Sequence, residues 1–110
     1  MKNFEHSAFL AGIQNKRKAR VSFLSKTTNI VEERIVAPLD FGPLARSSNG
    51  KNYYFVWDYT GRGKPHPIPL IPDHVIKLEF LDEDFNPQDF ITWDTKKNRW
   101  KIPRNWGDLS

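Results

Sequence analysis

The aromatic residues of this sequence are concentrated at residues 53–59, which hold all three tyrosines, a tryptophan and a phenylalanine. This composition predicts a β-strand. In a strand, the odd-numbered residues of this stretch lie on one face and the even-numbered residues on the other. Both faces carry bulky groups, which is typical of a strand inside a small barrel rather than at an exposed edge. We expect Phe55 and Trp57 in the core, whereas Tyr54 suits either the core or a binding surface.

A helix is predicted for residues 4–17, where Phe9 and Ile13 sit four apart with Leu10 beside them. Gly12 weakens the interior of this helix. The basic run at residues 16–18 falls where cations complement the helix C-terminal dipole, and a contact with nucleic acid is the alternative interpretation.

From residue 19 the spacing of hydrophobic residues changes from about 3.6 residues, typical of a helix, to about 2 residues, which indicates strands. Residues 20–24 and 30–37 form a predicted hairpin, and Pro38 ends its second strand. Residues 39–41 form a third short strand.

Further strands follow the aromatic one. Pro67 and Pro69 make the segment around Ile68 extended but unsuited to a fully paired central strand. Residues 75–81 alternate again, after a bulge or short 3-10 turn at residues 72–74.

The C-terminal region departs from this pattern. Residues 90–93 and 99–102 bracket a polar stretch, which predicts a hairpin with Trp93 and Trp100 as a cross-strand pair. One helix followed by short, regularly spaced strands predicts a mainly β (α+β) fold, namely a small SH3-like or Sm-like β-barrel preceded by one N-terminal α-helix. At 110 residues we expect one domain, with a helix at 4–17, a barrel at 19–81 and a Trp-rich extension at 82–110.

Composition narrows the class of protein. The chain has no cysteine, so it forms neither a disulfide framework nor a thiolate metal site. No apolar run approaches the length of about 18 residues that a membrane-spanning helix needs. We therefore expect a soluble, cytoplasmic protein with no membrane partner.

Charge is unevenly distributed along the chain, although the net charge is only +4. Residues 1–64 hold eleven Lys or Arg against five Asp or Glu. Residues 65–89 hold one against six, and residues 90–110 hold five against two. This pattern allows a positive face for an anionic partner, and the alternative is that the charges serve solubility alone.

An N-terminal helix, a strand with a basic start, the stretch ERIVAPL at residues 33–39 and the aromatic strand YYFVWD at residues 53–58 together resemble the WYL domain. This bacterial family is named for a Trp-Tyr-Leu strand and has an Sm/SH3-like barrel. The resemblance runs from about Phe9 to Leu81. Arg34 with Pro38 four residues later matches the family's Arg-to-Pro step, and Tyr54 is the identical residue of the naming triplet.

The chain also departs from the family's pattern. His66 and His74 stand where the family usually has arginine, and two residues are inserted around Pro72. Family members mostly occur as sensor domains attached to a winged-helix DNA-binding domain, and they bind nucleic acid or another anionic ligand. The resemblance thus implies a stand-alone, divergent barrel that acts as a non-enzymatic, regulatory binding module without a cofactor.

Basic and aromatic residues interleave along the predicted barrel, as single-stranded nucleic acid requires, because bases stack on aromatic faces while cations follow the phosphates. The candidate ligand-binding residues are Arg20, Arg34, Tyr54, Trp57, Arg62, Lys64, His66 and His74. A buried Arg34 needs a partner, and an ion pair with Glu32 or Asp58 explains it as well as a ligand does. Gly61 and Gly63 allow close approach to a phosphate or simply make a turn.

The main alternative is a protein-interaction or self-association domain that uses a barrel edge and the tryptophans of the extension, Trp93, Trp100 and Trp106. These tryptophans equally suit a role in capping the barrel. A small nuclease built on His66, Lys64 and Tyr59 is a weaker alternative, because their spacing matches no signature. No metal site is expected, because the His, Asp and Glu residues lack ligand spacing.

Overall fold

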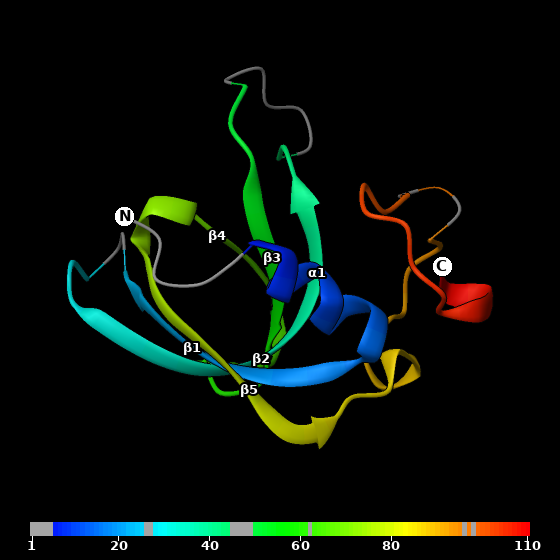
Figure 1. The fold of residues 1–110 in the computed structure, drawn as a ribbon, viewed down its shortest axis with the longest axis horizontal. Helices are drawn as coiled ribbons and strands as arrows, with labels where there is room; N and C mark the ends of the chain where they lie inside the picture. Colours follow the sequence, from blue (N-terminus) through cyan, green and yellow to red (C-terminus); the bar gives the residue numbers. More distant parts are fainter. Residues whose placement is uncertain (1–5, 26–27, 45–49, 62, 96, 98) are drawn as a thin grey trace.

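Five strands form one antiparallel sheet in the order β4-β3-β2-β1-β5 (Figure 1). The structure is a computed structural model, and it describes residues 6–25, 28–44, 50–61, 63–95, 97 and 99–110. Its elements are α1 (His6–Asn15), β1 (Arg17–Leu24), β2 (Val31–Gly42), β3 (Tyr53–Asp58), β4 (His66–Leu70), the 3-10 turn η1 (Pro72–His74), β5 (Val75–Asp84), and the 3-10 turns η2 (Pro87–Asp89) and η3 (Gly107–Leu109).

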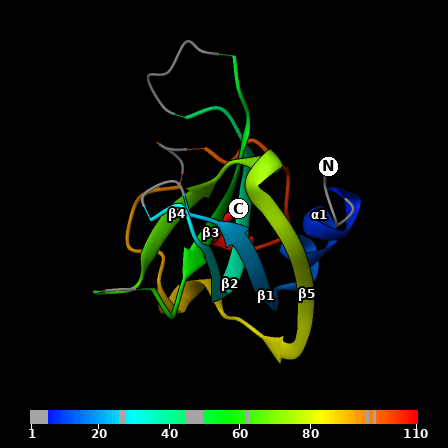
Figure 2. The same cartoon turned by 90° about the vertical axis from the view of Figure 1, so that its left-hand side faces the viewer.

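The long strand β2 joins the two halves of the sheet. Its first half pairs with β1 up to Val36, and its second half pairs with β3 as far as Gly42. Between them the strand curves strongly, so that the sheet wraps around its own core (Figure 1, Figure 2). One N-terminal helix and a curved, five-stranded antiparallel sheet confirm the predicted mainly β fold class and are consistent with a small barrel.

Pro38 does not end this strand, so the predicted break between residues 37 and 39 is wrong. β2 runs through Pro38 with a register shift before Asp40 in its pairing with β3. Pairing with β1 has already ended at Val36, so no carbonyl of β1 needs an N–H from the proline. The irregularity also breaks strict alternation and buries residues 36–40 in a row.

The basic run at residues 16–18 lies outside the helix, which corrects its expected role at the helix C-terminus. α1 ends at Asn15, and Lys16 adopts the left-handed conformation with φ 54°, so that β1 begins at Arg17. The Arg17 guanidinium donates to the Leu81 carbonyl oxygen from Nε at 3.0 Å and Nη2 at 2.6 Å. Cationic side chains here therefore tie β1 to β5. Residues 4 and 5 of the predicted helix lie outside the described residues.

Gly12, which weakens the helix by propensity, is required by packing. A Cβ at this position would overlap the Phe80 ring of β5 and press on the Pro38 ring of β2. Phe9 and Ile13 are buried on the same side of α1. The helix thus lies closer to the sheet than a helix with a side chain at position 12 could.

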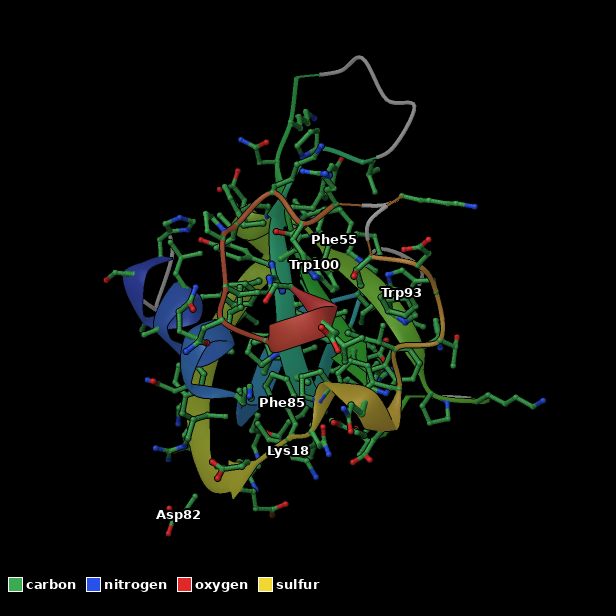
Figure 3. The ribbon with its side chains drawn as sticks, turned by 90° about the vertical axis from the view of Figure 1, so that its right-hand side faces the viewer. Lys18, Phe55, Asp82, Phe85, Trp93 and Trp100 are labelled. Atoms are coloured by element: carbon green, nitrogen blue, oxygen red, sulfur yellow. The ribbon has the colours of Figure 1, made fainter. Side chains whose placement is uncertain are left out.

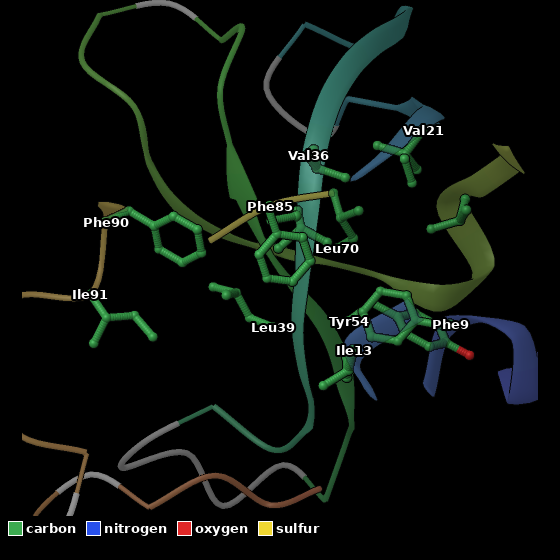
Figure 4. Packing of buried hydrophobic residues seen from close by; sticks show 14 of the residues in the cluster. Phe9, Ile13, Val21, Val36, Leu39, Tyr54, Leu70, Phe85, Phe90 and Ile91 are labelled. Carbon is green, nitrogen blue, oxygen red and sulfur yellow. The ribbon is translucent and has the colours of Figure 1, made fainter. Parts of the chain in front are cut away.

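Alternation along β3 places Tyr54, Val56 and Asp58 in the interior. The Tyr54 ring packs against the rings of Phe9 and Phe41, with centroids 4.7 Å apart in both pairs (Figure 4 shows the Phe9 contact). Phe55 and Trp57, expected in the core, instead lie half-buried on the opposite face. Both faces of β3 are therefore covered, as its bulky side chains predict.

The segment after β3 follows the sequence prediction closely. β4, with its two prolines, lies at one edge of the sheet, and the expected 3-10 turn at residues 72–74 is η1. β5 forms the other edge and extends to Asp84, beyond the predicted end at Leu81.

Residues 85–110, here called the tail, contain no strand within the described positions, so the predicted hairpin is wrong. The backbone N–H groups of Lys101 and Ile102 donate to the Asp40 carboxylate instead of to a partner strand, at 3.0–3.2 Å. The expected contact between Trp93 and Trp100 does form, edge to face, with centroids 6.1 Å apart.

Trp106 confirms that the tail caps the barrel. Its side chain is buried, and Nε1 donates to the carbonyl oxygen of Ile13 at 2.9 Å. Arg104 is buried beside it, with its guanidinium over the rings of Trp100 (4.0 Å) and Trp106 (4.6 Å). Burial lowers the pKa of Arg104 to about 10, and the Asp40 carboxylate opposes this shift.

The buried indole should stabilise the whole domain. We expect Trp106→Ala to lower the free energy of unfolding by about 3–5 kcal/mol in urea denaturation, because it opens a cavity and removes the hydrogen bond from the indole to the Ile13 carbonyl oxygen. Leu109→Ala, a half-buried control in the same turn, should cost less. A loss below about 1 kcal/mol for Trp106→Ala would show that the tail folds independently of the core.

The Asp40 carboxylate should control how tightly the tail is held. Asp40→Asn replaces an acceptor oxygen with an NH₂ group and removes the charge opposite Arg104, so we expect a loss of about 1.5–3 kcal/mol. Hydrogen exchange should accelerate at the amides of Lys101 and Ile102, while the exposed control Asp82→Asn leaves both unchanged. Equal protection in Asp40→Asn would contradict this role.

Candidate functional site

The predicted cations of the barrel are mostly paired. Arg20 lies on the outer face of β1, where Nη1 is 3.1 Å from the Glu79 carboxylate and Nε is 3.6 Å from that of Glu33. Lys18 pairs with Glu83 at 3.5 Å. Such exposed pairs add little stability, but they place carboxylates beside the charges that an anion would need.

Arg34 forms both ion pairs that the sequence suggested. Its guanidinium contacts the Glu32 carboxylate, and Nε lies 3.3 Å from Asp58 Oδ2. The hydrogen bond from Arg34, helped by those from Ser25 and Thr28, lowers the pKa of Glu32 to about 2. Two carboxylates thus face one guanidinium, which disfavours an additional anion at this point.

A groove beside this cluster brings together three residues of the WYL resemblance. Arg34 and His66 line a hollow of about 350 Å³, and His74 lines a neighbouring one of about 210 Å³. The two hollows share Phe23 and Leu70. His66 Nδ1 donates to the Lys64 carbonyl oxygen at 2.9 Å, which leaves Nε2 as the acceptor in the neutral ring.

The aromatic residues expected to bind ligand on β3 are already engaged. Tyr54 is buried, and its hydroxyl lies 2.8 Å from His6 Nδ1. The Trp57 ring stacks on Phe90, with centroids 4.8 Å apart and planes 14° apart. The Tyr54 ring is therefore closed to a base, and one face of the Trp57 ring is covered by Phe90.

The loop after β3 is explained by its own hydrogen bonds. Asp58 Oδ1 accepts the N–H groups of Thr60 at 3.0 Å and Gly61 at 2.9 Å. A Cβ at Gly61 would overlap the same carboxylate, so glycine is required by the turn. Lys64 is exposed in this loop, and Arg62 lies outside the described residues.

Aromatic rings and free cations meet elsewhere, in a cleft of about 540 Å³ where the tail passes over β3 and β4. Phe55 and Pro67 line it from the sheet, and Trp93 and Trp100 line it from the tail. Figure 3 shows Phe55, Trp93 and Trp100 on the same side of the molecule. We call this the tail cleft.

Three cations border the tail cleft, namely Lys97, Arg99 and Lys101. All three are exposed, and within the described part of the chain none forms an ion pair. The one carboxylate that lines the cleft, that of Asp40, accepts the tail's backbone N–H groups and pairs with Arg104. The cleft therefore offers uncompensated positive charge beside aromatic surface.

Sequence reasoning found this site only in part. It selected Trp93 and Trp100 as partner-binding residues and missed Phe55 and the three cations. The signals were an excess of basic residues in 90–110 and the alternation of basic and aromatic residues at 99–101. Trp106, grouped with the other two tryptophans, is buried and offers no binding surface.

The described part of the chain holds neither a metal-binding cluster nor a membrane-spanning helix. No group of three or more His, Asp or Glu side chains there is placed to hold a metal ion. No described helix combines the length and apolar character needed to span a bilayer.

No protein-family model matches the sequence, and no curated protein does. Among solved structures, the chain is similar to proteasome accessory factor B/C (PafBC) of Arthrobacter aurescens, with a TM-score of 0.56 and 18% sequence identity. The match covers 91% of this chain but 13% of PafBC. At this identity the likeness shows a shared fold.

Proposed function

We propose that this chain is a non-enzymatic, regulatory binding module of WYL-like type, whose ligand is nucleic acid or a nucleotide-like anion. The observation that carries this proposal is the tail cleft, where three aromatic side chains line one cavity together with three cations that form no ion pair within the described residues. The fold shared with part of PafBC supports the WYL-like relation only coarsely.

The chemistry of the cleft suits single-stranded rather than duplex nucleic acid. Bases that are not paired can stack on aromatic side chains, and each such stack typically contributes about 1–3 kcal/mol. Lys97 and Arg99 are exposed and carry donors that pair with phosphate oxygens. In a duplex the base faces are covered, and aromatic rings of this kind have nothing to stack on.

The barrel residues selected from sequence support the proposal less well. Arg20 and Arg34 each face two carboxylates, and the Tyr54 ring is buried. We therefore assign ligand binding to the tail cleft rather than to the groove beside Arg34. The alternative function, protein interaction through the tail and a sheet edge, predicts binding with weak dependence on salt.

Binding should be visible in tryptophan fluorescence, because Trp93 and Trp100 line the cleft. We expect saturable quenching by oligo(dT) and oligo(U), with affinity that falls log-linearly as salt rises. The double variant Lys97→Ala/Arg99→Ala should weaken binding and reduce the salt slope by about 1.4, at about 0.7 per phosphate contact on a single strand.

The matched control is Lys51→Ala/Lys77→Ala, which removes two exposed positive charges outside the cleft. It should leave the affinity and the slope close to those of the unmodified protein. If the control variant loses as much affinity as the cleft variant, binding depends on the net charge of the protein and not on the cleft. If no quenching occurs at low salt, the nucleic-acid proposal fails.

A further inference from the structure

We propose that the tail cleft is built for a single nucleotide, with one base stacked on Trp93 and its phosphate held by Lys97 and Arg99. This inference rests on the proposed function and narrows the ligand to a mononucleotide-sized molecule. The base and phosphate contacts that it names come from the tail, while β3 and β4 supply the opposite wall of the cleft.

Size is the first argument. The cleft has a volume of about 540 Å³, within the range of about 300–1,000 Å³ that small-molecule sites occupy. Sites that bind single strands without sequence preference extend over about 4–16 nucleotides along a continuous basic groove. A cleft of this volume is large enough for the base, sugar and phosphate of one nucleotide.

The distribution of free charge is the second argument. A longer strand needs further cations beside the cleft, but Lys18, Arg20 and Arg34 of the sheet face carboxylates, and the exposed Lys64 and Lys77 do not line the cleft. The side chain of Arg104 is buried over two indole rings. Unpaired charge borders the cleft and does not continue from it along the sheet through these residues.

Of the two indole rings that line the cleft, that of Trp93 has fewer interactions with the rest of the protein than that of Trp100. The Trp100 ring is covered by the Arg104 guanidinium at 4.0 Å, and its Nε1 donates to the Leu109 carbonyl oxygen at 2.8 Å. The ring contact of Trp93 is the edge-to-face one with Trp100. Trp93 is also half-buried, so it is held in place and yet exposed enough to meet a base. Phe55 faces the same cavity from β3.

The cations differ in how firmly they are placed. The backbone of Lys101 is fixed by Asp40, and its aliphatic chain lies against Gly42. Lys97 and Arg99 are exposed and adapt to a phosphate through long side chains. Together they supply the charge-assisted hydrogen bonds that a phosphate monoester requires, with Arg99 able to bind two of its oxygens at once.

Titration with adenosine 5′-monophosphate tests the inference directly, with adenosine, ribose 5-phosphate and a 12-nucleotide oligo(dT) as comparisons. We expect the monophosphate to bind with one site per chain, and at least about tenfold more tightly than adenosine or ribose 5-phosphate. Because the ligand bridges the tail and the sheet, the monophosphate should also raise the melting temperature.

Two variants locate the binding site. Trp93→Leu should weaken monophosphate binding by about 5- to 150-fold, the equivalent of one stacked base. Lys97→Ala/Arg99→Ala changes only exposed side chains, so its loss of binding cannot be attributed to misfolding. The control Lys51→Ala/Lys77→Ala should bind the monophosphate normally.

Each contrary result has a separate meaning. If oligo(dT) binds through the cleft and the monophosphate does not, the proposed function stands and the single-nucleotide inference is overturned. If the monophosphate binds equally well to the cleft variants, the site is elsewhere and the inference is likewise overturned. If neither ligand binds, both proposals fail.

Discussion

The buried carboxylate of Asp40 determines where the last quarter of the chain lies. It accepts the backbone N–H groups of Lys101 and Ile102 and pairs with the buried guanidinium of Arg104, which in turn lies over two indole rings. A buried charge is stable only when it is paired and hydrogen-bonded, so these contacts depend on one another. The tail therefore packs without a strand of its own, and the cleft over β3 exists because it packs there.

The sheet supplies the rigid side of that cleft. β2 bends past Pro38 and carries Asp40, while β3 presents Phe55 on its outer face and Tyr54 to the core. Because side chains alternate along β3, one strand serves the hydrophobic core and the cleft at the same time. The lining thus comes from two parts of the chain that are distant in sequence.

The cations of the barrel and those of the tail differ in how they are paired. On the barrel, Lys18, Arg20 and Arg34 face carboxylates, whereas Lys97, Arg99 and Lys101 form no ion pair within the described residues. A list of basic and aromatic residues does not contain this distinction. It explains why the candidates chosen on the barrel gave way to the tail, although the excess of basic residues at positions 90–110 was visible from the start.

The sequence by itself determined the helix, four of the five strands and the turn at residues 72–74. Each of these depends on residues close together in the chain, whose periodicity and turn chemistry act locally. Only the tertiary structure decided that β2 continues through Pro38, that Tyr54 faces the core, and that the tail is held without a hairpin. Asp40 and Lys101 are separated by 61 positions, and no local pattern encodes a contact between residues so far apart.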